Sequence, residues 1–336
     1  MNIERFLGHV AAALCSFGLA TAAQAQINEH TFRFTTTNPA GHPIVAGAEK
    51  WAALVQQKSG GKITIKIFPG GVLGADDQVL SATRRGKIDF TAMNSGYLQA
   101  RIRAFALLDF PFLFNDEKEA DAILDGPIGK QLADKTPAKG LINLAFWELG
   151  FRNLTNNKRP IIKMEDISGL KIRVIPSSIY SDTFNALGAE AVPMPFPEVY
   201  RAMKRRTIDG HENALSVIEA NKIYEVQKYL TITNHVYNPQ SLLASKKTWD
   251  KLTADEQSLL ASTAIEAGKF EREISRSGEA QTLANLQKLM QVNVLSHDEL
   301  AKLRTSLQPV IEKYTVMVGP ELVGQVQSQL EKMRKK

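Results

Sequence analysis

The amino-acid sequence predicts an α/β fold of two lobes with a ligand-binding cleft between them. Strands and helices alternate between positions 31 and 93 and again between positions 171 and 208. About 310 residues follow position 25, which is more than one hydrophobic core accommodates comfortably. The hydrophobic content of 44% is that of a globular protein. Because ligands of open α/β sheets bind beyond the carboxyl ends of the strands, functional side chains are expected there.

The first unit is predicted from alternating strand residues, helical spacing and glycine stops. Apolar positions with a period of two, or a short apolar run, indicate strands. Ala46, Trp51 and Leu54 share one stripe of a helix that Gly60 ends. The expected elements, in chain order, are Thr31–Thr36, His42–Lys58, Lys62–Phe68, Asp76–Arg85 and Ile88–Met93. This β-α-β-α-β order predicts a parallel sheet flanked by helices.

The second unit repeats this pattern, and helices follow it. Its expected elements are strands Lys171–Ile175 and Ala191–Met194, helices Ser178–Leu187 and Glu198–Arg205, and a short buried segment at Ile208. Residues Thr253–Met290 and Asp298–Lys332 have the spacing of amphipathic helices. We expect those two helical segments to pack on a core and to carry no chemistry.

The N-terminal 25 residues have the features of an export signal. Arg5 precedes an apolar stretch that ends in the small-x-small sequence Ala23-Gln24-Ala25, which predicts cleavage before Gln26 or Ile27. An uncleaved membrane anchor is the alternative, but the stretch is shorter than the roughly 20 apolar residues of a spanning helix. Cys15 is the only cysteine, so the exported chain is expected to form no disulfide.

Charge and motifs argue against nucleic-acid binding and catalysis. The net charge is +6, but acids and bases are interspersed, and no basic stripe carries aromatic residues. Dinucleotide and phosphate loops are absent, and His211-Glu212 is followed by Leu215 where a zinc-protease helix needs histidine. We therefore expect no enzyme activity, no cofactor and no metal site. An enzyme using His42, His211 and Asp209 is the alternative.

An ordered series of motifs carries a family resemblance across the chain. The main motifs are Gly150-Phe-Arg152-Asn-Leu-Thr-Asn156, Asp166-Ile-Ser-Gly-Leu-Lys-Ile-Arg173-Val174, Pro193-Met-Pro-Phe196-Pro-Glu-Val-Tyr200 and Asp209-Gly-His-Glu-Asn213. Supporting motifs include Gly86-Lys-Ile-Asp89, Phe110-Pro-Phe-Leu-Phe114 and Thr233-Asn-His235. Together they resemble the substrate-binding proteins of tripartite ATP-independent periplasmic (TRAP) transporters.

The resemblance implies a type II-like periplasmic binding protein with hinge strands and a long helix between the lobes. The expected domains are a signal peptide at 1–25, lobe I at 26–149 plus 238–277, and lobe II at 150–237 plus 278–336. A bound organic acid is expected to draw the lobes together. A monomer in the periplasm would then deliver the acid to a permease of one small and one large membrane subunit. A receptor for an ATP-driven importer or a sensor is an alternative.

Three ligand contacts are carried over from the resemblance. An arginine at the position of Arg173 pairs with the ligand carboxylate in this family, and Arg152 and Asn213 match two further contacts. Guanidinium and carboxylate groups form two parallel hydrogen bonds, which suits this role. From the residues alone, Arg173 could instead reach solvent, Arg152 could pair with Glu148 or Asp209, and Asn213 could cap a helix.

The remaining ligand candidates are predicted from their places in the chain. Phe196 resembles the aromatic wall of the family's site, with core packing as its alternative. Asn38 and His42 follow the first strand, and Asn94 and Tyr97 follow the third, at carboxyl ends. His42 could instead cap a helix, and Tyr97 could be a packed ring.

Two departures from the family pattern bear on the ligand. Ala214 stands where the family usually has proline after Asn213, and Tyr97 stands where sialic-acid-binding relatives have a second arginine. We therefore expect a monocarboxylate with a polar or aromatic body, such as a sugar acid or an aromatic or keto acid. A C4-dicarboxylate is the alternative if Arg152 or His42 binds its second carboxylate.

Overall fold

The structure is a computed structural model that describes residues 26–335. The predicted export signal lies outside these residues. Within them, no helix is long and apolar enough to cross a membrane. The strands form one mixed sheet in the order β2-β1-β3-β8-β4-β7-β5-β6, and β9 pairs with β8. These strands are β1 (His30–Thr35), β2 (Ile63–Phe68), β3 (Phe90–Asn94), β4 (Leu141–Asn156), β5 (Lys171–Val174), β6 (Glu190–Pro193), β7 (Gly210–Ala214), β8 (Tyr229–Ser245) and β9 (Gln291–Val294).

The helices flank this sheet, with local signals at many of their ends. Thr253 and Glu256 form a capping box at the start of the longest helix, and Asp116 accepts a hydrogen bond at another start. The α-helices are α1 (Pro43–Lys58), α2 (Asp76–Arg84), α3 (Glu117–Leu124), α4 (Pro127–Ala133), α5 (Ser178–Ala186), α6 (Phe196–Lys204), α7 (Leu215–Ala220), α8 (Lys246–Trp249), α9 (Ala254–Leu289), α10 (His297–Ser306), α11 (Gln308–Val318) and α12 (Pro320–Arg334).

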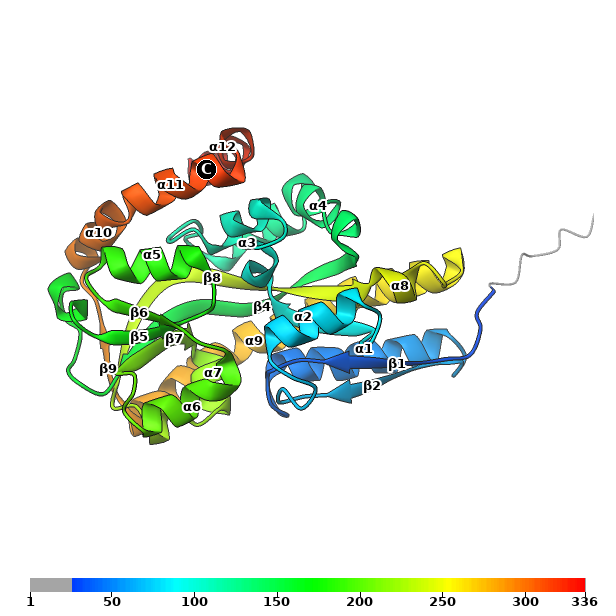
Figure 1. The fold of residues 1–336 in the computed structure, drawn as a ribbon, viewed down its shortest axis with the longest axis horizontal. Helices are drawn as coiled ribbons and strands as arrows, with labels where there is room; N and C mark the ends of the chain where they lie inside the picture. Colours follow the sequence, from blue (N-terminus) through cyan, green and yellow to red (C-terminus); the bar gives the residue numbers. More distant parts are fainter. Residues whose placement is uncertain (1–25, 336) are drawn as a thin grey trace, which may run out of the picture.

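Two α/β units stand on either side of a shared centre (Figure 1). Strands β1 and β2 pair in parallel in the first unit, as do β5 and β6 in the second. The long strands β4 and β8 pair antiparallel and connect the units, with register shifts such as the one between Glu148 and Gly150. Helix α9 contacts α1, β4 and α7, so it also reaches both units. The predicted two-lobed α/β class is confirmed.

Each unit has apolar packing of its own. In the first unit Trp51 of α1 packs with Phe34 and Phe90 of the sheet, and all three are fully buried. Val199 of α6 and Ile218 of α7 belong to the core of the second unit. A third cluster runs under α5, α11 and α12. Helix α11 packs against both α5 and the 3-10 helix Arg103–Asp109. The C-terminal helices therefore contact residues assigned to both predicted lobes, and the lobe boundaries stay a prediction.

The predicted elements of both units are present, with ends that differ by a few residues. The segment Asp298–Lys332 is helical as expected, and it is divided into the three helices α10, α11 and α12. The chain breaks at Leu307, before Pro309, and again at Gly319, which has a φ of 110° and precedes Pro320. A proline cannot continue a preceding helix, and a positive φ favours glycine, so both breaks have a local cause.

Candidate functional site

A central cavity lies between the two units, at the carboxyl ends of several strands. Its volume is about 380 Å³, including its opening to solvent. The residues that line it are Thr37, Asn38, Asp76, Asn94, Tyr97, Leu149, Arg152, Arg173, Ile175, Phe196, Asn213, Val217, Asn238 and Gln240. All the ligand residues expected from the sequence are in this set except His42. The structure therefore brings together side chains from both halves of the chain.

Arg173 lies on β5 with its side chain buried and its guanidinium facing this cavity. Its Nε donates a hydrogen bond of 2.8 Å to the carbonyl oxygen of Met194, and the group lies 5.7 Å from the centroid of the Phe196 ring. Among residues 26–335 its two terminal nitrogens have neither a hydrogen-bond acceptor nor an ion-pair partner. Burial lowers the pKa of Arg173. A planar, incompletely paired guanidinium in a cavity is suited to an anion.

Arg152 is also buried, but Glu212 pairs with it. Nε and one terminal nitrogen of Arg152 donate to the Glu212 carboxylate, and its other terminal nitrogen donates to Asn238 Oδ1 at 3.0 Å. Burial acts to raise the pKa of Glu212, but Arg152 and a hydrogen bond from His235 hold it at about 2. Arg152 thus has a structural partner, which is Glu212 rather than the Glu148 or Asp209 considered from the sequence.

Amide side chains supply the hydrogen-bonding groups of the cavity wall. Asn94 Oδ1 accepts from the backbone nitrogen of Gly96 at 2.6 Å, while its buried Nδ2 has no partner among the described residues. Asn238 Nδ2 is likewise buried and without a described partner. Asn213 lies within β7 and its Oδ1 accepts from Ala214, the residue that precedes α7. The capping role considered for Asn213 is therefore wrong.

The other predicted residues of the cavity have simple local contacts. Asn38 Nδ2 donates to Thr36 Oγ1 at 3.2 Å in the loop after β1. Tyr97 lies in a 3-10 turn after β3 and packs partly against the large apolar cluster, and burial raises its pKa. Phe196 begins α6, packs against two apolar clusters and also faces Arg173, so it combines core packing with a place in the cavity.

Sequence reasoning missed four polar residues of the cavity: Thr37, Asp76, Asn238 and Gln240. Asp76 is the first residue of α2 and is 6% exposed. Burial raises the pKa of its carboxyl to about 6, against the lowering effects of Arg173 and of a hydrogen bond from Thr37. The only sequence signal was an acid in the first turn of a helix, which is common at helix starts.

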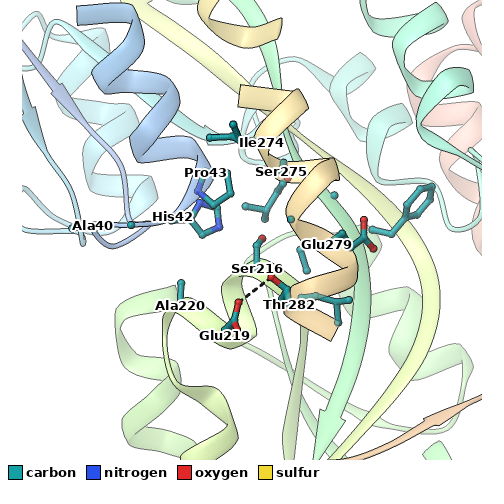
Figure 2. Close-up of a pocket in the computed structure, with 17 residues that line it drawn as sticks. Ala40, His42, Pro43, Ser216, Glu219, Ala220, Ile274, Ser275, Glu279 and Thr282 are labelled. Atoms are coloured by element: carbon teal, nitrogen blue, oxygen red, sulfur yellow. Dashed lines mark hydrogen bonds between the residues drawn. The ribbon is translucent and has the colours of Figure 1, made fainter. Parts of the chain in front are cut away.

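The expectation that His42 contacts the ligand with the other candidates is corrected, because His42 lines a different cavity. That second cavity lies between the start of α1, α7 and the middle of α9 (Figure 2). His42 Nδ1 accepts from the backbone nitrogen of Ile44 at 3.1 Å, and burial lowers the pKa of the ring to about 3. The helix-capping alternative for His42 is therefore the observed one. On the facing wall Thr282 donates to Glu219 at 2.9 Å.

The residues considered for an enzyme share no cavity. His42 lines the second cavity, whereas Asp209 lines a surface groove beside α6. His211 is fully buried on β7, with its Nδ1 2.7 Å from Thr155 Oγ1. The described residues include no cluster of three or more histidine, cysteine or acidic side chains with the arrangement of a metal site.

Comparison with known proteins gives consistent similarities. Residues 34–316 match the family model of bacterial extracellular solute-binding proteins, family 7. The chain is 35% identical over 268 residues to the 2,3-diketo-L-gulonate-binding periplasmic protein of Escherichia coli K12, covering 80% of this chain and 82% of that protein.

Two solved structures are also similar. A TRAP periplasmic solute-binding protein from Ochrobactrum anthropi is 48% identical with a TM-score of 0.83, covering 92% of this chain and 97% of that chain. The sugar-acid-binding protein of Advenella mimigardefordensis, in complex with galactonate, is 40% identical with a TM-score of 0.90. That match covers 91% of this chain and 99% of the Advenella chain.

Proposed function

Because this chain belongs to family 7 of the bacterial extracellular solute-binding proteins, we propose that it captures a small organic acid for a TRAP transporter. The observation that carries the proposal is Arg173, a buried guanidinium whose terminal nitrogens face the central cavity without a described partner. A charged group with so little exposure to solvent and so few partners is costly, and an anionic ligand supplies the missing contacts.

The carboxylate of the ligand accepts two parallel hydrogen bonds from Arg173. Charge-assisted hydrogen bonds contribute roughly 1.5–3 kcal/mol each in net terms. Residues of both units line the cavity, so closure around the ligand removes water from that pair and strengthens it. The amide side chains of Asn94, Asn213 and Asn238 then contact the rest of the ligand.

The leading ligand class is a sugar acid or an aromatic or keto monocarboxylate. The Escherichia coli and Advenella relatives are named for a diketo sugar acid and for sugar acids, which supports the first of these. A C4-dicarboxylate would need a second cationic partner. Arg152 is paired with Glu212 and His42 lines the other cavity, so neither supports that alternative.

Partners and location follow from the family. The protein is proposed to act as a monomer in the periplasm after removal of residues 1–25, and to deliver its ligand to a small and a large permease subunit. Lobe I would comprise 26–149 and 238–277, and lobe II the rest of the chain from 150. Catalysis on the bound acid is the less favoured alternative, because its candidate residues share no cavity.

A melting-temperature screen tests the proposal. The protein from residue 26 is unfolded and refolded to remove bound ligand, then heated with sugar acids, C4-dicarboxylates, aromatic acids and amino acids. At 1,000 times its dissociation constant, a ligand stabilises the folded state by about 4 kcal/mol. One class of acids should raise the melting temperature and be recovered unchanged by mass spectrometry. A refolded protein that no acid stabilises would contradict the proposal, and conversion of the acid would favour the enzyme.

A further inference from the structure

The central cavity contains a carboxylate opposite the guanidinium that is proposed to bind the ligand. We propose that Asp76 determines specificity, by accepting hydrogen bonds from hydroxyl groups of a polyhydroxy monocarboxylate and repelling the second charge of a dicarboxylate. This inference rests on the proposed function, because it needs the ligand carboxylate to be held by Arg173. It concerns the hydroxyl groups of the ligand, for which only the amide side chains have so far been proposed as contacts.

Asp76 has unused hydrogen-bonding capacity. Its nearest side-chain donor is Thr37 Oγ1, at 3.3 Å from Oδ1 and 3.4 Å from Oδ2, which are long distances for a hydroxyl donor. Among the described residues Asp76 forms no ion pair, although Arg173 across the cavity acts on it electrostatically. A buried carboxylate with few donors is poorly solvated, so ligand hydroxyl groups that donate to it replace lost water.

The charges around the cavity disfavour a second negative charge on the ligand. The buried pair Arg152–Glu212 is neutral as a unit, and Arg173 balances Asp76. A monocarboxylate bound to Arg173 therefore leaves one net negative charge in the cavity, whereas a dicarboxylate leaves two. The second carboxylate of a dicarboxylate would also approach a carboxylate that cannot donate a hydrogen bond to it. Asp76 thus disfavours dicarboxylates for two reasons: it repels their second charge, and it offers that carboxylate no hydrogen-bond donor.

Two buried donors in the same cavity fit the hydroxyl class. Asn94 Nδ2 and Asn238 Nδ2 have no described partner, and both residues line the cavity with Asp76. A hydroxyl group donates one hydrogen bond and accepts two, so a chain of hydroxyls can donate to Asp76 and accept from these amides. An unsubstituted acid would leave all three groups unsatisfied. Recognition of this kind rejects a ligand that lacks its hydroxyls.

The test is a titration of refolded wild-type protein by calorimetry at pH 8, where the carboxyl of Asp76 is ionised. The probes are galactonate, a polyhydroxy monocarboxylate; hexanoate, which lacks hydroxyls; and succinate, a dicarboxylate. Wild type should bind galactonate at least about tenfold more tightly than either other acid, which corresponds to about 1.4 kcal/mol. Equal affinity for galactonate and succinate would overturn the inference.

Asp76→Asn tests the residue itself, and Asp77→Asn is the matched control because Asp77 is the exposed neighbour on the same helix turn. Asp76→Asn should weaken galactonate binding about tenfold or more and reduce the ratio of galactonate affinity to succinate affinity. Asp77→Asn should change neither affinity. Asp76→Ala, checked by its melting curve, serves if the asparagine variant does not fold. Binding that depends on Arg173 but not on Asp76 would overturn this inference alone. Absence of binding by all three acids would overturn this inference, and the proposed function would fall with it only if the wider melting-temperature screen also finds no stabilising acid.

Discussion

The two buried arginines of the central cavity differ in what their guanidinium groups contact. Arg152 has the carboxylate of Glu212 and the amide of Asn238 around it. Arg173 has only the carbonyl of Met194, through Nε. Breaking a buried ion pair leaves an uncompensated charge, whereas removing a partnerless buried cation removes a desolvation cost. The two residues should therefore respond differently to the same substitution.

Arg173→Ala should leave the ligand-free protein folded and change its free energy of unfolding by less than about 1 kcal/mol. The same substitution should weaken binding of the ligand acid by at least about 2 kcal/mol. That loss is roughly a thirtyfold rise in the dissociation constant. Arg152→Ala is the contrast, because it should lower the free energy of unfolding by about 3–5 kcal/mol. Calorimetric titration and urea unfolding measure the two effects. Unchanged affinity in a well-folded Arg173→Ala protein would exclude Arg173 as the carboxylate contact.

Sequence reasoning found the cationic side of the cavity better than the opposite wall. Arg173 is conspicuous because it interrupts an apolar strand, and the motif around it is specific. Asp76 has no such signal, since acids are ordinary in the first turn of a helix. His42 was misplaced because the loop after β1 borders two cavities: Asn38 lines one and His42 the other. Residue type and position at a strand end do not distinguish them.

At the scale of elements, the long helix α9 packs closely on the first unit through a glycine. A Cβ added at Gly268 would lie 2.7 Å from Cδ1 and 2.8 Å from Nε1 of Trp147, a fully buried ring on β4. That ring is itself fixed by a hydrogen bond of 3.1 Å to the carbonyl oxygen of Ala264. One turn of α9 thus has no space for a side chain, whereas Gly278 on the same helix has open space around it.

Gly268→Ala should therefore lower the free energy of unfolding by about 1–3 kcal/mol, because the indole or the helix must shift. Gly278→Ala is the matched control on the same helix. It should be neutral or stabilising by up to about 1 kcal/mol, because alanine has the higher helix propensity and meets no neighbour. Urea unfolding of both variants gives the comparison. A Gly268→Ala protein as stable as Gly278→Ala would show that this contact relaxes without cost.

Element prediction succeeded where local periodicity is regular and failed where tertiary pairing decides. The strands and helices of both units follow from alternation and glycine stops. Strands β4 and β8 were absent from the predicted strands, because register shifts such as that between Arg152 and Leu154 break the alternation. Their existence as connecting strands came only through the family resemblance.

For the whole molecule, the observed arrangement has the two units in contact across the cavity. Gln99 of the first unit donates a hydrogen bond to Ser177 of the second. At the rim, a Cβ on Gly71 would lie 3.7 Å from Cγ of Pro197, so the loop after β2 meets the start of α6. Each of these two contacts is local, whereas the pairing of β4 and β8 is continuous. The rim should therefore open by motion about these strands, and a ligand that bridges the units should close it.

Spin labels across the rim test this closure. Cys15 is the only cysteine of the sequence, so a chain beginning at residue 26 accepts two labels without further changes. Val72→Cys and Glu198→Cys place exposed labels on the two facing units. A bound acid at saturating concentration should make the distances between the two labels shorter and their distribution narrower, because the ligand selects the closed arrangement. Pulsed electron–electron double resonance measures these distances. The control pair is Gln57→Cys with Val72→Cys, both on the first unit. Its distance distribution should be the same with and without the acid. A cross-rim distance that does not respond to bound acid would mean that the units are already held closed without it.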